Sequence, residues 1–231
     1  MKIKNEFLAN IDAECTTFFY MNSIKHILWD WNGTLLDDVD SCIEVINTML
    51  SKRGLPIFKN KSEYRQAFCF PVVNYYVAAG FDFSKEPFEV LAEEYIALYQ
   101  KQKPCLYDTT ETVLKNISKK GITQYIFTAS KKEELLRQIS MYKSIVPYFK
   151  QLITSDNILA SGKFESAKAW LEQSKANPNE VLVIGDTLHE KEIADKLNFN
   201  CALVLGGHQD LSGIKKKVLV LKNIEQILDI I

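Results

Sequence analysis

The sequence predicts an α/β protein with a doubly wound, Rossmann-like and mostly parallel sheet, into which an all-helical domain is inserted. The first observation is a set of short apolar runs without polar alternation, which is typical of strands buried on both faces of a sheet. The second is that the segments between these runs have helical patterns, as crossovers between parallel strands require. The runs expected to form strands are 26–30, 122–128, 151–154, 181–186, 201–205 and 217–222.

Two crossover helices carry start signals. Asp108 is expected to cap a helix that has Glu111 three residues later and ends at Gly121. Ser130 and Glu133 have the spacing of a capping box and are expected to begin the next helix. The alternation of strands with such helices favours a doubly wound sheet.

A long interval interrupts this alternation. Residues 39–105 contain no convincing strand, and their first part, 39–50, places apolar residues on one helical face. Residues 88–104 form another helical pattern, rich in good helix formers, and the aromatic-rich segment 64–81 lies between the two. We therefore expect a helical domain at 39–105, inserted into an α/β core of residues 21–38 and 106–231.

The composition bounds the kind of protein. With 231 residues, 47% of them hydrophobic, and a net charge of −1, the chain suits one large α/β domain or a core with a smaller insert. The near-neutral charge argues against a nucleic-acid-binding face, and no apolar stretch is long enough to cross a membrane. Five scattered cysteines without metal-site spacing indicate reduced thiols and a cytoplasmic location. The sequence leaves the oligomeric state unknown.

The first twenty residues stand apart from this scheme. Residues 1–20 interleave acids with apolar residues and lack the uninterrupted core of a signal peptide. Met21 then precedes the first expected strand in the manner of a natural start. Residues 1–20 are therefore expected to be an N-terminal extension of unclear role, either an accessory segment or an upstream extension of the reading frame.

Polar residues at the ends of the expected strands carry the chemistry. Ligands of an open parallel sheet gather outside the carboxyl ends of its strands, so Asp30, Thr128 and Asp186 are expected to converge there. Lys163, placed just before a helix, can reach the same edge. Two carboxylates can hold Mg²⁺, and a phosphate would meet that cation, the hydroxyl, the ammonium and the backbone N–H groups around Gly33. A carboxylate beside phosphorus can act as a nucleophile and form an acyl phosphate.

These residues resemble, in order, four motifs of the haloacid dehalogenase superfamily. Residues 30–34, Asp-Trp-Asn-Gly-Thr, are similar to its first motif, Asp-x-Asp-Gly-Thr after an apolar strand. Thr128 at a strand end is similar to the second motif, Lys163 to the third, and Asp186 after "VLVIG" to the fourth. The resemblance runs from about Lys25 to the C-terminus and is greatest to phosphoglycolate-phosphatase-like members with a helical cap.

The resemblance implies a Mg²⁺-dependent phosphohydrolase of a small phosphorylated metabolite, with an aspartyl-phosphate intermediate on Asp30. It implies that the metal is bound by Asp30, the backbone carbonyl of Asn32 and Asp186, and that the insert is a mobile cap over the substrate. The positions implied to be catalytic are Asp30, Asn32 and Lys163. The residues implied to bind the substrate are Gly33, Thr34, Thr128, Ala129 and Lys163.

Asn32 is the main departure from the family pattern. Phosphatases of the family usually carry Asp here, where it protonates the leaving oxygen and then deprotonates water; Asn can do neither, although it can form hydrogen bonds. General acid–base help is typically worth about 10²–10⁴ in rate. Three consequences are open: activity on activated acyl or aryl phosphates, a substitute acid such as Asp37 or Asp38, or slow hydrolysis. Asp37 and Asp38 are otherwise expected to be helix-cap and hinge residues.

Several further residues have both a functional and a structural interpretation. Glu190 lies where the fourth motif often has a second acid, but a position on the helix surface without a function is an equal alternative for it. Glu192 is a neighbouring candidate for the same role. Lys168, the other lysine nearby, is expected to be solvated. His189 and His208 lie in loops, where a lone histidine is more often structural. The aromatic residues expected mostly in the core of the insert, with one or two facing the crevice, are Tyr64, Phe68, Phe70, Tyr75 and Tyr76.

Rival functions follow from the same residues. A catalytically weakened or non-catalytic binding protein would keep the fold and lose turnover through Asn32. A phosphonatase-like hydrolase also departs from Asp at this position, but it needs a cap lysine in an Arg-x-x-Met-Gly-x-x-Lys setting that the sequence lacks. A dehalogenase needs no metal, whereas Asp186 favours a metal site.

Overall fold

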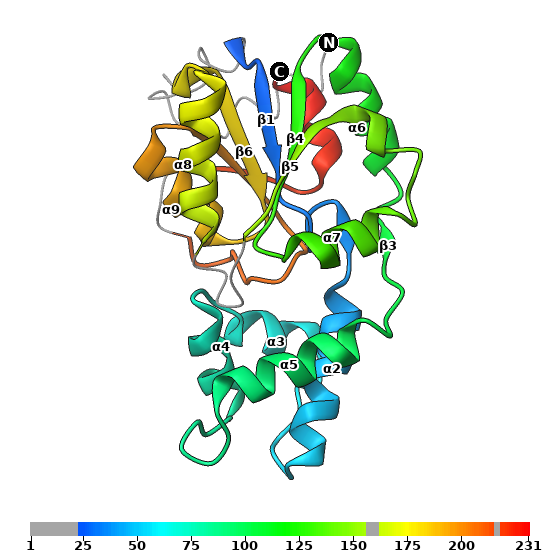
Figure 1. The fold of residues 1–231 in the computed structure, drawn as a ribbon, viewed down its shortest axis with the longest axis vertical. Helices are drawn as coiled ribbons and strands as arrows, with labels where there is room; N and C mark the ends of the chain where they lie inside the picture. The colour runs from blue at the N-terminus through cyan, green and yellow to red at the C-terminus, as the bar shows by residue number, and fades with distance from the viewer. Residues whose placement is uncertain (1–22, 156–161, 215–217) are drawn as a thin grey trace.

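A six-stranded parallel sheet in the order β5-β4-β1-β6-β7-β8 forms the centre of the molecule (Figure 1). The structure is a computed structural model that describes residues 23–155, 162–214 and 218–231, so segment 1–20 lies outside the described residues. Each predicted strand is present, within a few residues at its ends, which confirms the α/β, doubly wound fold. The strands are β1 (His26–Trp29), β4 (Thr123–Phe127), β5 (Phe149–Ile153), β6 (Val181–Gly185), β7 (Asn200–Val204) and β8 (Leu219–Leu221).

Two apolar cores hold helices against the two faces of this sheet. Side chains alternate along β1, so Ile27 and Trp29 pack with residues of α6 and α7, whereas Leu28 packs with residues of α8 and α9. All three side chains are fully buried. The helices are α6 (Thr110–Lys119), α7 (Lys132–Ile139), α8 (Lys163–Ser174) and α9 (Leu188–Leu197), with 3₁₀ segments at Val146–Tyr148, Pro178–Glu180 and Ile224–Asp229. None of the helices in the described part of the chain could span a membrane, since none combines sufficient length with sufficient apolar character.

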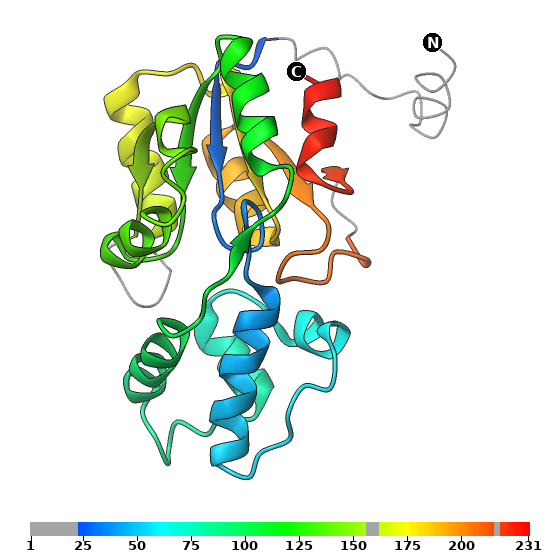
Figure 2. The ribbon, with the colours of Figure 1, turned by 90° about the vertical axis from the view of Figure 1, so that its right-hand side faces the viewer.

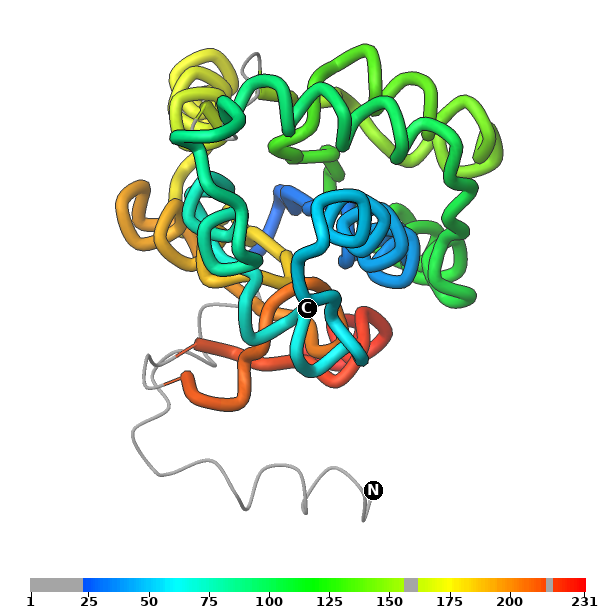
Figure 3. The backbone as a smooth tube through the Cα atoms, turned by 90° about the horizontal axis from the view of Figure 1, so that it is seen from below, coloured from blue at the N-terminus to red at the C-terminus, as the bar shows by residue number. Residues whose placement is uncertain are grey.

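Four further helices lie together beyond one end of the sheet (Figures 1 and 2). They share a core of their own, distinct from the two cores on the sheet. Seen from below in Figure 3, they lie across that end of the molecule. We use "insert" for residues 39–105, which contain α2 (Val39–Lys52), α3 (Lys61–Ala67), α4 (Val72–Ala79) and α5 (Phe88–Tyr99).

The chain enters and leaves the insert through two short strands. These are β2 (Leu36–Asp37) and β3 (Cys105–Leu106), which pair antiparallel and run side by side in Figure 2. The pairing joins Leu36 to Leu106 and Asp37 to Cys105. The two ends of the insert are therefore held next to each other.

Both predicted helix caps are wrong in detail. α6 has Thr109 instead of Asp108 at its cap position, and α7 has Lys131 instead of Ser130; neither cap residue makes a side-chain cap hydrogen bond. The Ser130 hydroxyl instead donates to Asn32 Oδ1, 3.0 Å away. A partner that is distant in the sequence thus replaces the local cap, a competition that short-range spacing does not reveal.

The order of the strands creates the position of the site. β1 lies between β4 and β6, and the loops that follow neighbouring strands diverge at such a switch point, which leaves a crevice at their carboxyl ends. Asp30 follows β1, Thr128 follows β4 and Asp186 follows β6. The insert lies at this same end of the sheet (Figure 1).

Candidate active site

Asp30 and Lys163 form a buried ion pair at the carboxyl end of the sheet. The backbone N–H of Asp30 donates to the Ile184 carbonyl in β6, 2.8 Å away, which fixes Asp30 at the end of β1. Lys163, the first residue of α8, has its Nζ atom 2.5 Å from Asp30 Oδ1. Burial would lower the pKa of Lys163, but the charges of Asp30 and Glu190 outweigh burial and raise it. The ammonium group is therefore charged at neutral pH.

Glu190 is the second anionic partner of Lys163, not a residue of the helix surface. Its Oε1 atom lies 2.6 Å from Lys163 Nζ, and its Oε2 atom accepts hydrogen bonds from the Thr187 hydroxyl and backbone N–H at 2.5 and 3.1 Å. Thr187 and Glu190 form the capping box of α9. Glu192 points elsewhere, with its side chain 53% exposed. The described geometry therefore favours Glu190 over Glu192 as a residue of the site.

We expect Glu190→Gln to lower the free energy of unfolding by about 2–4 kcal/mol, because it removes a buried charge next to a buried ammonium group. Glu192→Gln is the matched control, and it is expected to stay within about 0.5 kcal/mol of the wild type because Glu192 is exposed. Urea unfolding followed by circular dichroism measures both. Equal effects of the two substitutions would contradict the assignment of Glu190 to the Lys163 ion pair.

Asp186 is held by two backbone segments that approach it closely. Its Oδ2 atom accepts a hydrogen bond from the backbone N–H of His208, 2.5 Å away. A Cβ atom at Gly207 would lie 2.1 Å from this oxygen, and a Cβ atom at Gly33 would lie 2.5 Å from it. Gly33 also has φ of +70°, which side chains rarely adopt. Glycine at 33 and 207 thus allows the turn after Asp30 and the loop after β7 to enclose Asp186.

The charges at this edge of the sheet fit a divalent cation. Thr34 Oγ1 lies 3.4 Å from Asp30 Oδ2 and 3.4 Å from Asp186 Oδ1, so the two carboxylates flank one hydroxyl. Burial, reinforced by the neighbouring carboxylates, raises the pKa of Asp30 to about 8 and that of Asp186 to about 6, so a cation bound beside them would favour their charged forms. Carboxylate oxygens are ligands that Mg²⁺ prefers. Among the described residues, the buried carboxylates are Asp30, Asp38, Asp186 and Glu190, whereas the buried cationic side chains are Lys163 and His208.

Asn32 is fixed by hydrogen bonds on both sides of its amide. Its Nδ2 group donates to Asp38 Oδ2 at 2.8 Å and to the Tyr99 hydroxyl at 3.2 Å, and its Oδ1 atom accepts from the Ser130 hydroxyl at 3.0 Å. The Tyr99 hydroxyl in turn donates to Asp38 Oδ2 at 2.6 Å. The amide therefore orients its neighbours, and it has no proton that it could exchange with a leaving group.

Asp38 and His208 form a second buried ion pair beside Asn32. His208 Nε2 lies 3.1 Å from Asp38 Oδ1. Burial would lower the pKa of His208, but the charge of Asp38 raises it to about 9. Burial would likewise raise the pKa of Asp38, but His208 and the hydrogen-bond donors around Asp38 hold it below its usual value. Asp38 does occupy the N-cap position of α2, as predicted, but its side chain makes no cap hydrogen bond and bonds to the site instead. His208 is more than a turn residue.

Cys42 completes a group with Asp38 and His208 whose ligand atoms all lie within 4.8 Å of one another, as in some metal sites. Both oxygens of Asp38 already accept hydrogen bonds, however: Oδ1 from the Gly33 N–H at 2.8 Å and Oδ2 from Tyr99. The group is therefore a hydrogen-bond network. The Gly33 N–H, expected at the sequence level to meet phosphate, is instead bonded to Asp38 and to the Leu36 carbonyl.

A cavity of about 450 Å³ lies between the core and the insert. From the core it is lined by six of the predicted site residues. Thr34 and Gly33 lie behind this wall, against Asp186. The predicted site residues that line the cavity are Asp30, Asn32, Thr128, Ala129, Lys163 and Asp186.

Sequence reasoning missed several residues of the site. Tyr99 ends a helix of the insert and Ser130 had been assigned to a cap, yet both contact Asn32. His208 was left open, although its place after β7, at the carboxyl end of a strand, was a usable signal. The Lys168 side chain lies on the exposed surface, as expected.

The family model for haloacid dehalogenase-like hydrolases matches residues 27–204. This match spans the first strand, the insert and the sheet as far as β7, and includes each of the four motifs. The chain therefore belongs to the haloacid dehalogenase-like hydrolases, the family that its motifs resemble. A search of curated proteins finds no match.

Solved structures share the fold at low sequence identity. A haloacid dehalogenase-like family hydrolase from Streptococcus pneumoniae has a TM-score of 0.75 and 18% identity, over 90% of this chain and 98% of that one. A predicted phosphoglycolate phosphatase from Haemophilus somnus has a TM-score of 0.70 and 14% identity, over 90% and 98%. CbbY from Rhodobacter sphaeroides, solved in complex with phosphate, has a TM-score of 0.60 and 15% identity, over 89% and 99%. These similarities concern the fold, which includes both the core and the insert.

Proposed function

We propose that the protein is a Mg²⁺-dependent phosphatase of a small phosphorylated metabolite, with Asp30 as the nucleophile. One observation carries the proposal: the Asp30 carboxylate lines the cavity, with one oxygen paired with Lys163 and the other 3.4 Å from the Thr34 hydroxyl, which also lies 3.4 Å from Asp186. Family membership and phosphate in the CbbY structure support the same reaction class.

The proposed reaction has two displacements at phosphorus. Asp30 attacks the phosphorus atom, the bond to the leaving oxygen breaks, and an aspartyl phosphate forms. Water then attacks the same phosphorus, which releases inorganic phosphate and restores the carboxylate. Lys163 offsets the negative charge that gathers between Asp30 and the phosphoryl group, and Thr128 is placed to hydrogen-bond a phosphoryl oxygen.

Asp30, Asp186 and the backbone carbonyl of Asn32 would hold the Mg²⁺ ion. When bound, the ion would withdraw charge from the phosphoryl oxygens and so favour attack by a carboxylate. The excess of buried carboxylates over buried cations fits this assignment. The glycines at 33 and 207 fit it as well, because they keep Asp186 in place without adding bulk beside it.

A catalytically weakened binding protein is the second candidate, because Asn32 is fixed as a neutral amide where a general acid is usual. A phosphonatase-like reaction is less well supported, since no lysine of the insert is among the described residues that line the cavity.

Phosphate release from p-nitrophenyl phosphate tests the proposal. We expect release in the presence of Mg²⁺, its loss on addition of EDTA, and its return when Mg²⁺ is restored. Release that EDTA does not affect would contradict the metal assignment. Binding of phosphate esters without release of phosphate from any of them would support the binding protein instead.

A further inference from the structure

The insert contributes a wall without charge to the cavity. Among the described residues, no Asp, Glu, Lys, Arg or His of the insert lines the cavity. Its contribution is mainly aromatic and includes Phe68, Phe70, Tyr75, Tyr76, Phe88 and Tyr95. Because the phosphoryl group must lie against Asp30 and Lys163 on the core side, the remainder of the substrate, its leaving group, faces this wall.

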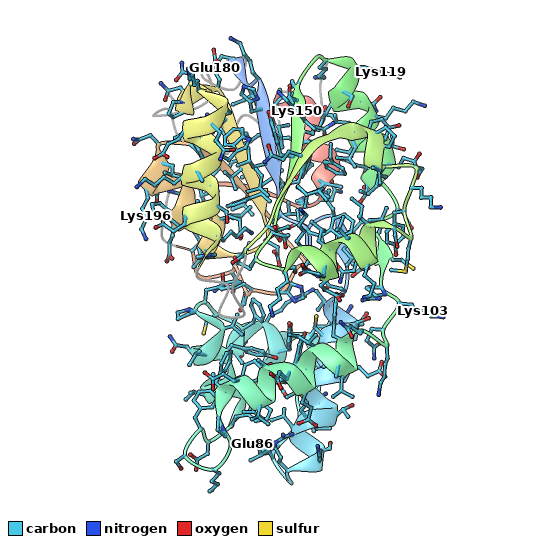
Figure 4. The ribbon with its side chains drawn as sticks, in the orientation of Figure 1. Glu86, Lys103, Lys119, Lys150, Glu180 and Lys196 are labelled. Carbon is cyan, nitrogen blue, oxygen red and sulfur yellow. The ribbon has the colours of Figure 1, made fainter. Side chains whose placement is uncertain are left out.

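Several charged side chains of the insert are paired with one another, and none of its described charged side chains lines the cavity. Arg53 Nη2 lies 2.7 Å from a Glu86 carboxylate oxygen and 2.5 Å from one of Glu94, and Lys52 Nζ lies 2.8 Å from the other oxygen of Glu94. Figure 4 shows Glu86 at the end of the insert that is far from the sheet. Arg65 donates through Nε to the Gly207 carbonyl at 2.7 Å. No cation of the insert is therefore placed to neutralise an anionic leaving group.

Two hydroxyl groups of this wall are already engaged, whereas the buried Tyr75 hydroxyl has no hydrogen-bond partner among the described residues. The Tyr64 hydroxyl lies 2.8 Å from His208 Nδ1, and that of Tyr99 donates to Asp38. On the core side, the start of α7 contributes Lys131 together with Glu133 and Glu134, and Glu134 is paired with Arg137 at 2.6 Å, so this set carries no excess of positive charge. A carboxylate or a polyhydroxyl chain bound here would lose its hydration and gain few hydrogen-bond partners, whereas an aromatic ring would gain contacts with several other rings.

The chemistry on the core side points to the same kind of leaving group. Asn32 has no proton to give to a leaving oxygen. An alkoxide is nearly as basic as hydroxide, whereas a phenoxide resembles the deprotonated tyrosine side chain, whose conjugate acid has a pKa of only about 10. A phenolic oxygen can therefore depart without a general acid far more readily than an alcoholic one.

From these two independent observations, and resting on the proposed phosphatase function, we propose that the substrate is a phosphate monoester of a neutral aromatic alcohol, with the phosphate on a phenolic oxygen. In the reaction, the P–O bond to the ring oxygen breaks, the phenoxide leaves with the electron pair and takes a proton from solvent, and the phosphoryl group passes to Asp30. Water then releases it as inorganic phosphate.

Three substrates separate the effect of the aromatic ring from the effect of the leaving oxygen. Phenyl phosphate has both the ring and the good leaving group, benzyl phosphate has the ring but an alcoholic leaving group, and 2-phosphoglycolate has an alcoholic leaving group and a carboxylate. We expect kcat/KM to decrease in that order, with benzyl phosphate at least about 10-fold above 2-phosphoglycolate because of the aromatic wall. A value for 2-phosphoglycolate equal to or above that for benzyl phosphate would overturn the inference.

Two phosphonates, which cannot be hydrolysed, distinguish failure of this inference from failure of the proposed function. Calorimetry with Mg²⁺ present compares benzylphosphonate with phosphonoacetate. Tighter binding of benzylphosphonate supports the inference even if no ester is hydrolysed, in which case the phosphatase function alone is contradicted. Equal or tighter binding of phosphonoacetate overturns the inference.

A charge placed in the wall provides a variant test. Ile96 lines the cavity from α5 and is half-buried, so a lysine can be accommodated there. We expect Ile96→Lys to lower the ratio of kcat/KM for benzyl phosphate over 2-phosphoglycolate by at least about 10-fold. Val90→Lys is the matched control on the same helix, because Val90 is 48% exposed and outside the cavity lining. An unchanged ratio in a folded Ile96→Lys protein would overturn the inference.

Discussion

Asp30→Asn is expected to abolish phosphate release, with a loss on the order of 10⁴-fold or more in kcat, because an amide cannot form the aspartyl phosphate. The substitution is close to isosteric, and Lys163 keeps Glu190 as a charged partner 2.6 Å away. We therefore expect the protein to remain folded. A malachite-green assay for phosphate, together with circular dichroism, measures both properties.

Asp40→Asn is the matched control for this loss. Asp40 lies on α2 with its side chain 76% exposed and pairs only with a surface lysine, Lys61. We expect its phosphate release to stay within about twofold of the wild type, since exposed ion pairs contribute little. If Asp30→Asn kept measurable turnover while remaining folded, a residue other than Asp30 would have to be the nucleophile.

Asn32→Asp is expected to raise kcat/KM on an alkyl phosphate by about 10²–10⁴, and on an aryl phosphate by much less. The new carboxylic acid would supply the proton that an alkoxide needs and a phenoxide can do without. Benzyl phosphate and phenyl phosphate make the comparison, since they share the ring and differ in the basicity of the leaving oxygen. Equal gains on both substrates would argue against this account of Asn32.

The same substitution is expected to cost stability. Asn32 Nδ2 lies 2.8 Å from Asp38 Oδ2, so an aspartate at position 32 would bring two carboxylates together and lose a hydrogen bond. We expect a decrease of about 1–3 kcal/mol in the free energy of unfolding. Asn74→Asp adds the same charge at an exposed position of α4 and serves as the control. A stable Asn32→Asp protein without the gain on benzyl phosphate would contradict the acid–base interpretation.

Much of the core could be predicted because its signals are local. The central strands β1, β4 and β6 are short runs that are buried on both faces, and such runs are visible without knowledge of their partners, while the edge strands β5 and β8 are partly exposed. The rule that ligands gather at the carboxyl ends of parallel strands then placed Asp30, Thr128 and Asp186 at one edge. The first turn of α8 brought Lys163 to the same edge. For these residues, position along the chain was sufficient.

The other contacts of the site could not be predicted because they join residues that are distant in the sequence. Asp38 pairs with His208 across 170 positions, and Ser130 bonds to Asn32 across 98. Spacing rules describe neighbours within a few residues, so they assigned Asp38 and Ser130 to helix caps and left His208 in a turn. Glu190 shows the same limit, because a buried and an exposed position near the start of a helix have similar local sequence.

The aromatic residues of the insert illustrate a different limit. Rings such as Tyr75 and Tyr76 were expected mostly in the core of the insert, and they do lie there. The same side chains also line the cavity. The hydrophobicity of a ring indicates that it is buried, but it does not show whether other protein side chains or a bound substrate cover it.

The paired strands β2 and β3 have a consequence for how such an enzyme can change. These strands hold the two ends of the insert side by side, with Leu36 opposite Leu106. The insert is therefore one continuous segment whose two ends join the sheet domain at the same place. Everything between these ends could be exchanged for another segment while the six-stranded sheet and its carboxylates remained in register. The insert, which contacts the leaving group, can therefore evolve independently of the sheet, which holds the reacting carboxylates. Substrate recognition can change in this way while the chemical step stays the same.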